Sequence, residues 1–309
     1  MIRHILRSLA RAAPALLVAW VLIFWLVQLT PGDPVNLMLG GTPASQETRD
    51  HLRQTLGLDR SPPERFVHFL GALATGDLGT SYRTREPVGA MIASQLPATL
   101  QLTAGGLLFG VVFGLLFGLV AGLRPNGVTD LVSTAAVLVG ASLPNFWTGM
   151  VLIWIFAIKL KWAPILGGGL GSLVLPSMTV GLFVVGGFAR LIRSSVIETM
   201  GQDFVRTARA KGLHPARIVL HHGLRNAMIP PITLLGMQVG TMISGAMVTE
   251  NIFARPGVGT LLIQSVLAKD LPVVQAIVAY TTASYILINL IVDLLYYLID
   301  PRIRVAGAR

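Results

Sequence analysis

The residues that could carry out chemistry are few, and their spacing suits none of the common reactions. The chain has no cysteine, so it offers no disulfide, no thiolate metal ligand and no thiol nucleophile. His221 and His222 are adjacent, so they point to different sides of a helix and make a poor chelating pair. The glycines at 167–169 and 171 lack the Lys-Ser/Thr of a phosphate-binding loop, and no GxxxxGK[ST], HExxH or GxSxG pattern occurs in the sequence. We therefore expect no catalytic, cofactor-binding or metal site on this chain.

Asp293 is the most informative ionisable residue within an apolar stretch. Asn289 lies four residues earlier on the same helical face, and Asp293 lies roughly 10 Å from the inner end of its helix at 1.5 Å per residue. A carboxylate in lipid is costly and usually functional, but at this shallow depth a structural pair or cap is favoured. We interpret Asn289 and Asp293 as structural polar residues, and a membrane enzyme would have to rely on Asp293 alone.

Long apolar helices must position these residues. A mean hydropathy of +0.69 over 309 residues indicates a membrane protein, and a span needs roughly 20 mostly apolar residues. The first run follows Arg3, Arg7 and Arg11 as in a secretory signal, but no small-residue cleavage site closes it, so we expect an uncleaved helix. The sequence thus predicts an all-α fold with six transmembrane helices, at about residues 12–30, 97–122, 131–158, 173–192, 229–249 and 273–299.

The distribution of charge predicts the orientation. With an inside N-terminus, 14 of the 24 basic residues fall on the inner side against five of the 14 acids. The net charge of +10 therefore follows the positive-inside rule, which places both termini in the cytoplasm and makes the charge weak support for nucleic-acid binding. Residues 31–95 become an extracytoplasmic insertion, in which QETRDHLRQTLGL and PPERFVHFLGALA predict two short helices after the PGDP turn.

Two features within the spans predict how the helices pack and where they bend. Glycines recur every four residues from Gly106 to Gly122, and Gly236, Gly240 and Ser244 repeat the pattern, so we expect smooth faces for close helix packing. Pro144 interrupts the third span with Ser142 and Asn145 beside it. A kinked helix lining a water-filled path and a purely structural kink both explain this SLPNFW segment.

The segment RTARAKGLHPARIVLHHGLRNAMIPP, from Arg206, is basic and contains no acid. Asp203 can cap a helix that ends at Gly212, and Pro215 suits the first turn of a second helix. A basic amphipathic segment on anionic lipid explains the charge, whereas a knob that enters a partner explains the small residues and the fixed turn. We expect a small surface of Thr207, Ala208 and Ala210 to be exposed near the bend. In the second helix one face carries Ala216, Leu220, Gly223, Leu224 and Ala227, and another carries Arg217, His221 and Arg225.

RTARAKG followed by LRNAMIP resembles the cytoplasmic coupling loop of ABC importer permeases of the dipeptide, oligopeptide and nickel class. LTPGDP, GDLGTSY, SLPNFW, TENIFARPGVG and NLIVDLLYYLIDPRIR occur in the order typical of that class, over essentially the whole chain. The resemblance implies the type I ABC importer fold, with an N-terminal tail and first helix (1–30), the insertion (31–95) and a core permease domain (96–309) that carries the coupling loop at about 198–226. It also implies residues that contact the ATPase, namely Thr207, Ala208, Ala210, Lys211, Gly212 and Leu213, and a possible path or gate at Ser142, Pro144, Asn145 and Glu250.

The same resemblance implies the partners and the activity. We expect a bacterial inner-membrane permease that pairs with a second homologous permease, one or two ATPase subunits that bind ATP and Mg²⁺, and an extracytoplasmic substrate-binding protein. The expected solute is a dipeptide or oligopeptide, with nickel or a metal chelate as the alternative. An ion-coupled transporter would show several intramembrane ionisable groups and an inverted repeat, and neither is visible in the sequence.

Overall fold

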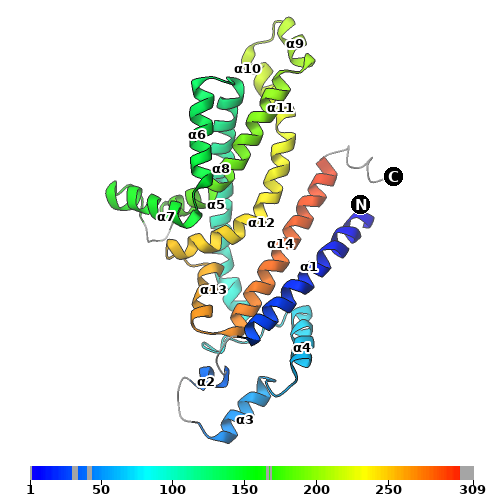
Figure 1. Ribbon diagram of the computed structural model, residues 1–309, viewed down its shortest axis with the longest axis vertical. Coiled ribbons are helices and arrows are strands. Elements are labelled where there is room, and N and C mark those ends of the chain that lie inside the picture. Colours follow the sequence, from blue (N-terminus) through cyan, green and yellow to red (C-terminus); the bar gives the residue numbers. More distant parts are fainter. Residues whose placement is uncertain (1, 30–33, 40–43, 165–166, 168, 300–309) are drawn as a thin grey trace. The chain divides into compact units, whose positions relative to one another are not determined.

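A computed structural model describes residues 2–29, 34–39, 44–164, 167 and 169–299, and within these ranges the side chains of 2–12, 37, 222, 229, 233–234, 237 and 293–299 lie outside the description. The described residues form helices and one isolated β-bridge between Thr80 and Pro87, without a strand (Figure 1). The all-helical prediction is therefore confirmed. The chain forms two compact units, residues 1–97 with 256–290 and residues 98–255 with 291–309.

The apolar helices that could cross a membrane can be counted only among the described residues. Among the described residues, three helices are long and apolar enough to cross a bilayer, and there are up to four if one bent pair counts as a single span. The three are α5 (Val88–Leu123), α8 (Gly171–Met200) and α14 (Leu271–Ile299). In α1 (Ile2–Gln28) the described side chains begin at Ala13, and Ala13–Gln28 is an apolar helical stretch. The count of six spans stays a prediction.

The first unit contains the predicted outer helices. It is built from α1, α2 (Pro34–Leu39), α3 (Gln46–Thr55), α4 (Pro62–Thr75), the start of α5, α13 (Val258–Leu267) and most of α14. The Ser45 hydroxyl accepts from the Thr48 amide at 3.2 Å to begin α3, and the Glu64 carboxylate accepts from the Ser61 amide at 3.0 Å to begin α4. Gly76 ends α4 at φ +77°, where an L side chain would be strained. Both helices are where the sequence predicts them, while the preceding turn at 31–33 lies outside the described residues.

Buried groups tie the pieces of the first unit together. Phe24 of α1 meets Phe66 and Phe69 of α4 with ring centroids 5.2 and 6.0 Å apart. The Ser81 hydroxyl and the Tyr82 amide both donate to the carboxylate of Asp270, the residue before α14, the latter at 3.0 Å. These contacts hold α4 against α1 and hold the GTSY segment against the start of α14.

The second unit is organised by the glycine-rich face of α5. A Cβ placed on Gly110, Gly114 or Gly118 would lie 2.6–2.8 Å from atoms of α8, so only glycine permits this approach. The facing residues, Val184, Phe188 and Ile192 on α8, are buried. The packing prediction for this stripe is confirmed. In α12 (Ile229–Ile252) the residues of the second pattern divide: Gly236 faces Val292, Gly240 is buried and Ser244 is exposed.

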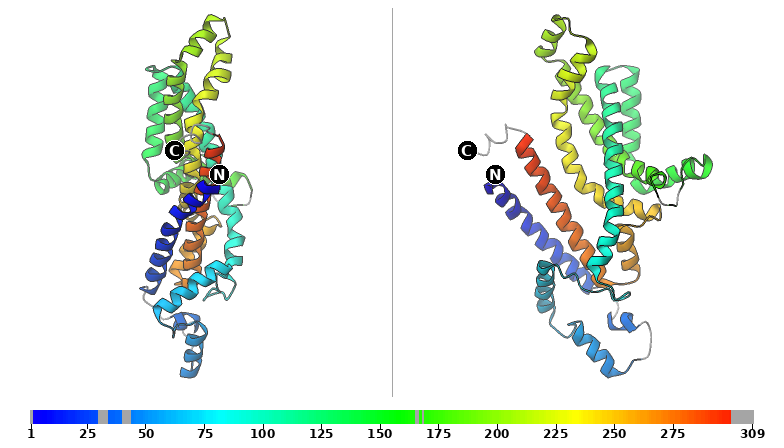
Figure 2. Two further views of the ribbon diagram at one scale, coloured as in Figure 1. Left: turned by 90° about the vertical axis from the view of Figure 1, so that its right-hand side faces the viewer. Right: turned by 180° about the vertical axis from the view of Figure 1, so that it is seen from behind.

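The SLPNFW segment breaks its span instead of kinking it. α6 (Val128–Ser142) ends where Leu143 turns extended at ψ 136°, and α7 (Asn145–Leu152) starts after Pro144 in a direction that differs by 108°. Pro144 disfavours helical backbone at Leu143, so the chain leaves the helix there and starts a new one. α7 continues as the π-helix η1 (Ile153–Lys159), and together they project sideways from α8 (Figures 1 and 2).

Candidate functional site

The basic segment forms a compact helical loop at the end of α8. After Gly201 the chain starts α9 (Asp203–Ala210), which follows Gln202 as the N-cap, so Asp203 lies in the first turn and is not the cap. Gly212 stands at φ +73°, the left-handed conformation that lets the chain reverse after α9. The His214 ring accepts from the Ala216 amide at 3.3 Å, which caps α10 (Pro215–Arg217). The predicted helix, stop and restart are confirmed.

This loop has its own hydrophobic core. Val205 and Ala208 of α9 pack against Ile218, and Met200 and Leu213 lie at the edge of this cluster. Ala208 is 7% exposed, so the prediction that it belongs to an exposed small surface is wrong. The reason is the helical spacing of Val205 and Ala208, which places both on the inner face of α9. Ala208 therefore supports the loop from within and is not available for direct contact with a partner.

The second helix of the loop does not keep the predicted register. After α10 the backbone continues as the π-helix η2 (Ile218–Gly223) and then as α11 (Leu224–Ala227). A π-turn adds a residue per turn and rotates the following side chains. Of the residues that we expected on one shared face, Ala216 and Leu220 are exposed, whereas Gly223 and Ala227 are buried. Ile218, which we did not assign to that face, is buried.

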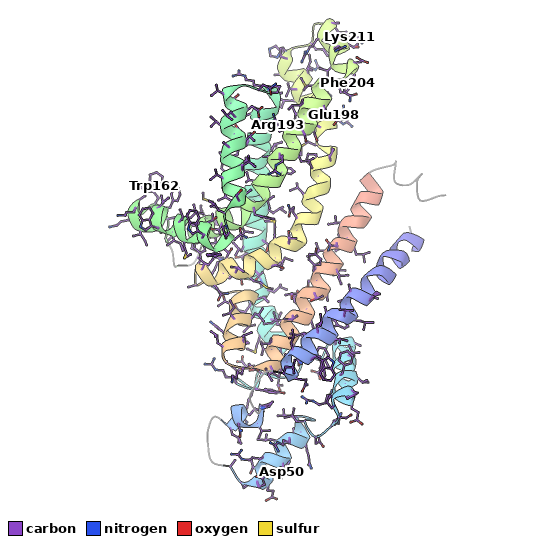
Figure 3. All side chains as sticks on the ribbon, in the orientation of Figure 1. Asp50, Trp162, Arg193, Glu198, Phe204 and Lys211 are labelled. Atoms are coloured by element: carbon purple, nitrogen blue, oxygen red, sulfur yellow. The ribbon has the colours of Figure 1, made fainter. Side chains whose placement is uncertain are left out.

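The exposed surface of α9 is basic with one aromatic side chain. Figure 3 shows Arg193, Glu198, Phe204 and Lys211 in this order toward the tip of the loop. Phe204 is 40% exposed, and the sequence analysis did not include it among the surface residues of the loop. Its position directly before the buried Val205 is a signal that could have identified it, because neighbouring residues on a helix point in different directions. Arg206 and Asp203 approach to 3.7 Å, a highly exposed pair that contributes little stability. The exposed residues of this loop tip are Phe204, Arg206, Thr207, Arg209, Ala210, Lys211 and Gly212, and Leu213 is half-buried beneath them.

An ion pair joins α6 to the part of α8 that leads to the loop. Arg193 donates to both oxygens of Asp130 at 2.6 and 2.7 Å, in the bidentate geometry that suits a guanidinium and a carboxylate. Asp130 also accepts from the Asn126 amide at 2.9 Å and from the Thr134 hydroxyl at 3.2 Å. The sequence places both charges on the inner side but gives no signal that they pair.

The polar residues at the break after α6 bond mainly to their own backbone. The Ser142 hydroxyl donates to the Leu138 carbonyl at 2.7 Å, and the Thr148 hydroxyl donates to the Pro144 carbonyl at 3.2 Å. Ser142 and Pro144 are exposed, and Asn145 is half-buried near Gly245 of α12. These bonds fit a structural break, and a role of Ser142, Pro144 or Asn145 in a path stays a prediction.

Glu250 is a fully buried carboxylate at 0% exposure near the end of α12. The Thr99 hydroxyl of α5 donates to its Oε1 at 2.6 Å. A buried carboxylate requires such partners because its desolvation is costly. The hydrogen bond from Thr99 links α5 with α12, and a role of Glu250 in a gate stays a prediction.

The remaining predicted polar residues are less informative. Asn289 is half-buried on α14, and the side chain of Asp293 lies outside the described residues. Within the described ranges, no cluster of three or more His, Asp or Glu side chains could hold a metal ion.

Comparison with known proteins identifies similar chains along the whole length. Residues 114–305 match the family model "binding-protein-dependent transport system inner membrane component", and residues 1–103 match the model of the N-terminal part of such membrane components. The glutathione transport system permease protein GsiC of Pectobacterium atrosepticum is 41% identical over 305 residues, covering 98% of this chain and 99% of the relative. GsiC of Escherichia coli K12 is 39% identical over the same shares.

Solved structures share the fold at low sequence identity. A chain of the inward-facing MetNI methionine ABC transporter superposes with a TM-score of 0.58 at 19% identity, over 70% of this chain and 99% of that chain. A chain from a crystal structure of an amino acid ABC transporter with histidines gives a TM-score of 0.54 at 17% identity, over 68% of this chain and 94% of that chain. The predicted importer-permease fold is thereby confirmed.

Proposed function

Because the chain belongs to the family of inner-membrane components of binding-protein-dependent transport systems, we propose that it imports short peptides as one permease of a two-permease complex. Family membership makes it a permease subunit of an ABC importer and a multi-pass protein of the bacterial inner membrane, not an enzyme. The names of the relatives, which specify glutathione, support a peptide as the solute.

The compact basic loop carries the mechanistic part of the proposal. We assign its exposed tip, with Thr207, Ala210, Lys211 and Gly212, to the contact with a cytoplasmic ATPase subunit, and we add Phe204 as an apolar anchor. Leu213 and Ala208 support this surface from beneath. A loop that has its own core can transmit force, because it moves as a rigid piece when the partner pushes it.

The loop sits directly on α8, so its displacement passes into the tightly packed helices of the second unit. When ATP closes a pair of ATPase subunits, two such loops are drawn together and the permeases change between inward- and outward-facing states. Arg193 and Asp130 lie along this route, since they clamp α6 to α8 before the loop begins. We assign Ser142, Pro144, Asn145 and Glu250 to a path or gate, because they lie at the break after α6 and near the end of α12.

Partner proteins supply nucleotide binding and solute delivery, for which the sequence of this chain shows no motif. ATP and Mg²⁺ bind to the ATPase subunits, an extracytoplasmic binding protein delivers the solute, and residues 31–95 face that side. Both termini lie in the cytoplasm in this arrangement, because the inner segments carry most of the basic residues. A reporter fused after Arg309 should therefore show the cytoplasm, and an extracytoplasmic signal would invert the topology.

An uptake experiment tests the solute. The chain is assembled with its permease, ATPase and binding-protein partners in proteoliposomes, and uptake of glutathione, trialanine and Ni²⁺ is measured with and without ATP. ATP-dependent uptake of either peptide supports the proposal. Uptake of Ni²⁺ or its chelate without peptide uptake would assign the chain to metal transport instead.

A further inference from the structure

A cavity of about 360 Å³ lies within the first unit and is not explained by the coupling loop or by the packing of the spans. Its walls come from the end of α1, the link between α3 and α4, one face of α4, the turn after α4 and the start of α14. This volume falls in the range of small-ligand sites. The lining mixes apolar groups such as Phe24 and Phe69 with amide, guanidinium and phenol groups.

Three charged residues line this cavity, Arg60, Arg65 and Asp77, and the fold holds Arg65 in place through a side-chain contact to α1. Phe66 and Phe69 dock α4 on Phe24, and this docking brings the half-buried Arg65 to Gln28, one turn beyond Phe24 on α1. The Arg65 guanidinium donates to the Gln28 side-chain oxygen at 2.9 Å. Arg65 therefore has a fixed position and does not extend freely into solvent.

Most of the hydrogen-bonding capacity of Arg65 is unused. A guanidinium has five N–H donors, and among the residues that the structure describes Arg65 meets the Gln28 amide and no carboxylate. Asp77, which also lines the cavity, accepts from the Gly79 amide at 2.9 Å and so is engaged in its own turn. Among the described residues, Arg65 thus forms no salt bridge, and its guanidinium can pair with the carboxylate of a ligand.

Tyr82 adds a second donor. Its backbone amide is fixed by Asp270, and its half-buried ring lines the same cavity. Burial raises the pKa of the Tyr82 phenol; the charge of Arg65 opposes this shift and that of Asp270 adds to it. The phenol therefore keeps its proton at neutral pH and can donate it in a hydrogen bond. The polar lining also includes a second guanidinium, that of Arg60, and the side chains of Gln28, Gln54, Thr55, His68 and Gln275.

We propose that this cavity is a binding site for the terminal carboxylate of a short peptide, with Arg65 and Tyr82 as the groups that recognise it. A guanidinium and a phenol match a carboxylate, the three glutamine amides match peptide N–H and C=O groups, and the aromatic walls match a side chain. The proposal rests on the proposed function, and it names a site on residues 31–95 and their neighbours, where an arriving solute would first meet the permease.

The test measures binding to the full chain alone, in nanodiscs of phosphatidylcholine, so that transport is not required. The probes are trialanine and its C-terminal amide, which differ in the carboxylate, and saturation-transfer NMR gives their relative affinities. Trialanine should bind at least about tenfold more tightly than its amide, because the amide loses the charge-assisted contact to Arg65. This comparison uses the unaltered protein, so it stands even if a variant fails to fold.

Variants then locate the contact. Arg65→Gln should remove the preference for the free carboxylate, Arg65→Lys should keep part of it, and Tyr82→Phe should reduce it. Arg83→Gln is the matched control, because Arg83 is exposed, lies beside Tyr82 and does not line the cavity. Equal binding of the two peptides, or an Arg65→Gln protein that still prefers the free carboxylate, would overturn the proposal.

A lipid headgroup could supply a similar oxyanion, so the nanodiscs are also prepared with phosphatidylglycerol. If the site takes lipid phosphate, phosphatidylglycerol abolishes peptide binding and is itself retained in an Arg65-dependent manner, which would reject the peptide proposal. The uptake experiment remains separate. Peptide uptake by the assembled complex with no binding to this chain would reject the cavity and leave the proposed transport function intact.

Discussion

Two alanines of α9, two residues apart, allow the folding of the coupling loop to be tested separately from its contact with the ATPase. Ala208 lies inside the loop core, whereas Ala210 lies on its exposed tip. A glutamate at either position adds the same charge and nearly the same volume. Ala208→Glu should therefore disrupt the loop itself, and Ala210→Glu should leave the loop folded and block contact with the ATPase.

The expected loss of loop stability in Ala208→Glu can be worked out from the residues of the loop core. Burial of Val205 and Ile218 contributes about 1.5–3 kcal/mol each, so the core provides about 3–6 kcal/mol in total. A carboxylate forced between them without a partner costs several kcal/mol, which is comparable with the whole of that contribution. The loop of Ala208→Glu should therefore open, while Ala210→Glu should change the stability of the loop by less than about 0.5 kcal/mol.

Limited trypsin digestion of the purified chain reads out loop folding, because Arg206, Arg209, Lys211 and Arg217 supply exposed cleavage sites. The Ala208→Glu chain should be cut much faster than the wild type, and the Ala210→Glu chain at the wild-type rate. Both should abolish solute-stimulated ATP hydrolysis in the assembled complex while the chain still inserts. An Ala208→Glu chain with wild-type protease resistance would contradict the buried core, and an Ala210→Glu complex with full stimulation would contradict the docking surface.

Three further outcomes are expected. Gly114→Leu should prevent accumulation of folded chain, because even its Cβ would lie 2.8 Å from the buried Phe188 and overpacking costs about 1–3 kcal/mol or more. Gly89→Ala is the control, because its Cβ would meet nothing within 4 Å. Normal thermal stability of Gly114→Leu would disprove the close approach of α5 to α8. Asp130→Ala should lower the melting temperature more than the double variant Asp130→Ala/Arg193→Ala, because the single change leaves the Arg193 guanidinium without its carboxylate. If the effects of the two single changes on stability simply add up in the double variant, the ion pair does not contribute. The purified chain alone should not hydrolyse ATP, since its sequence lacks a nucleotide loop, and robust turnover that copurifies with the pure chain would refute this.

The sequence predicts those features that depend on residues close together in the chain. Gly212 and Pro215 mark the stop and restart of the coupling loop because each acts through its own backbone angles. The glycine stripe predicts close packing for a similar reason, since a missing Cβ is visible in the sequence. Which helix fills the stripe is not visible, and α8 is identified by the structure.

Other features depend on tertiary contacts or on small changes of helix pitch. The π-helix at Ile218–Gly223 shifts the faces of the second loop helix, and no residue pattern in that segment announces it. Arg193 and Asp130 lie 63 residues apart, and Thr99 and Glu250 lie 151 apart, so their pairing requires the fold. Pro144 signals a disturbance of the third span, but its size, a turn of 108°, is set by the surrounding helices.

The glycine stripe also constrains how the chain length can vary. From Gly106 with Val180 to Gly122 with Val196, each of the five glycines of the stripe meets the residue 74 positions later in the chain, so the offset is constant over more than four turns. One inserted or deleted residue within either helix would rotate everything beyond it by about 100° and would place a side chain where only hydrogen fits. Length changes should therefore be tolerated in the loops that join these helices and excluded from the helices themselves, which an insertion scan would reveal.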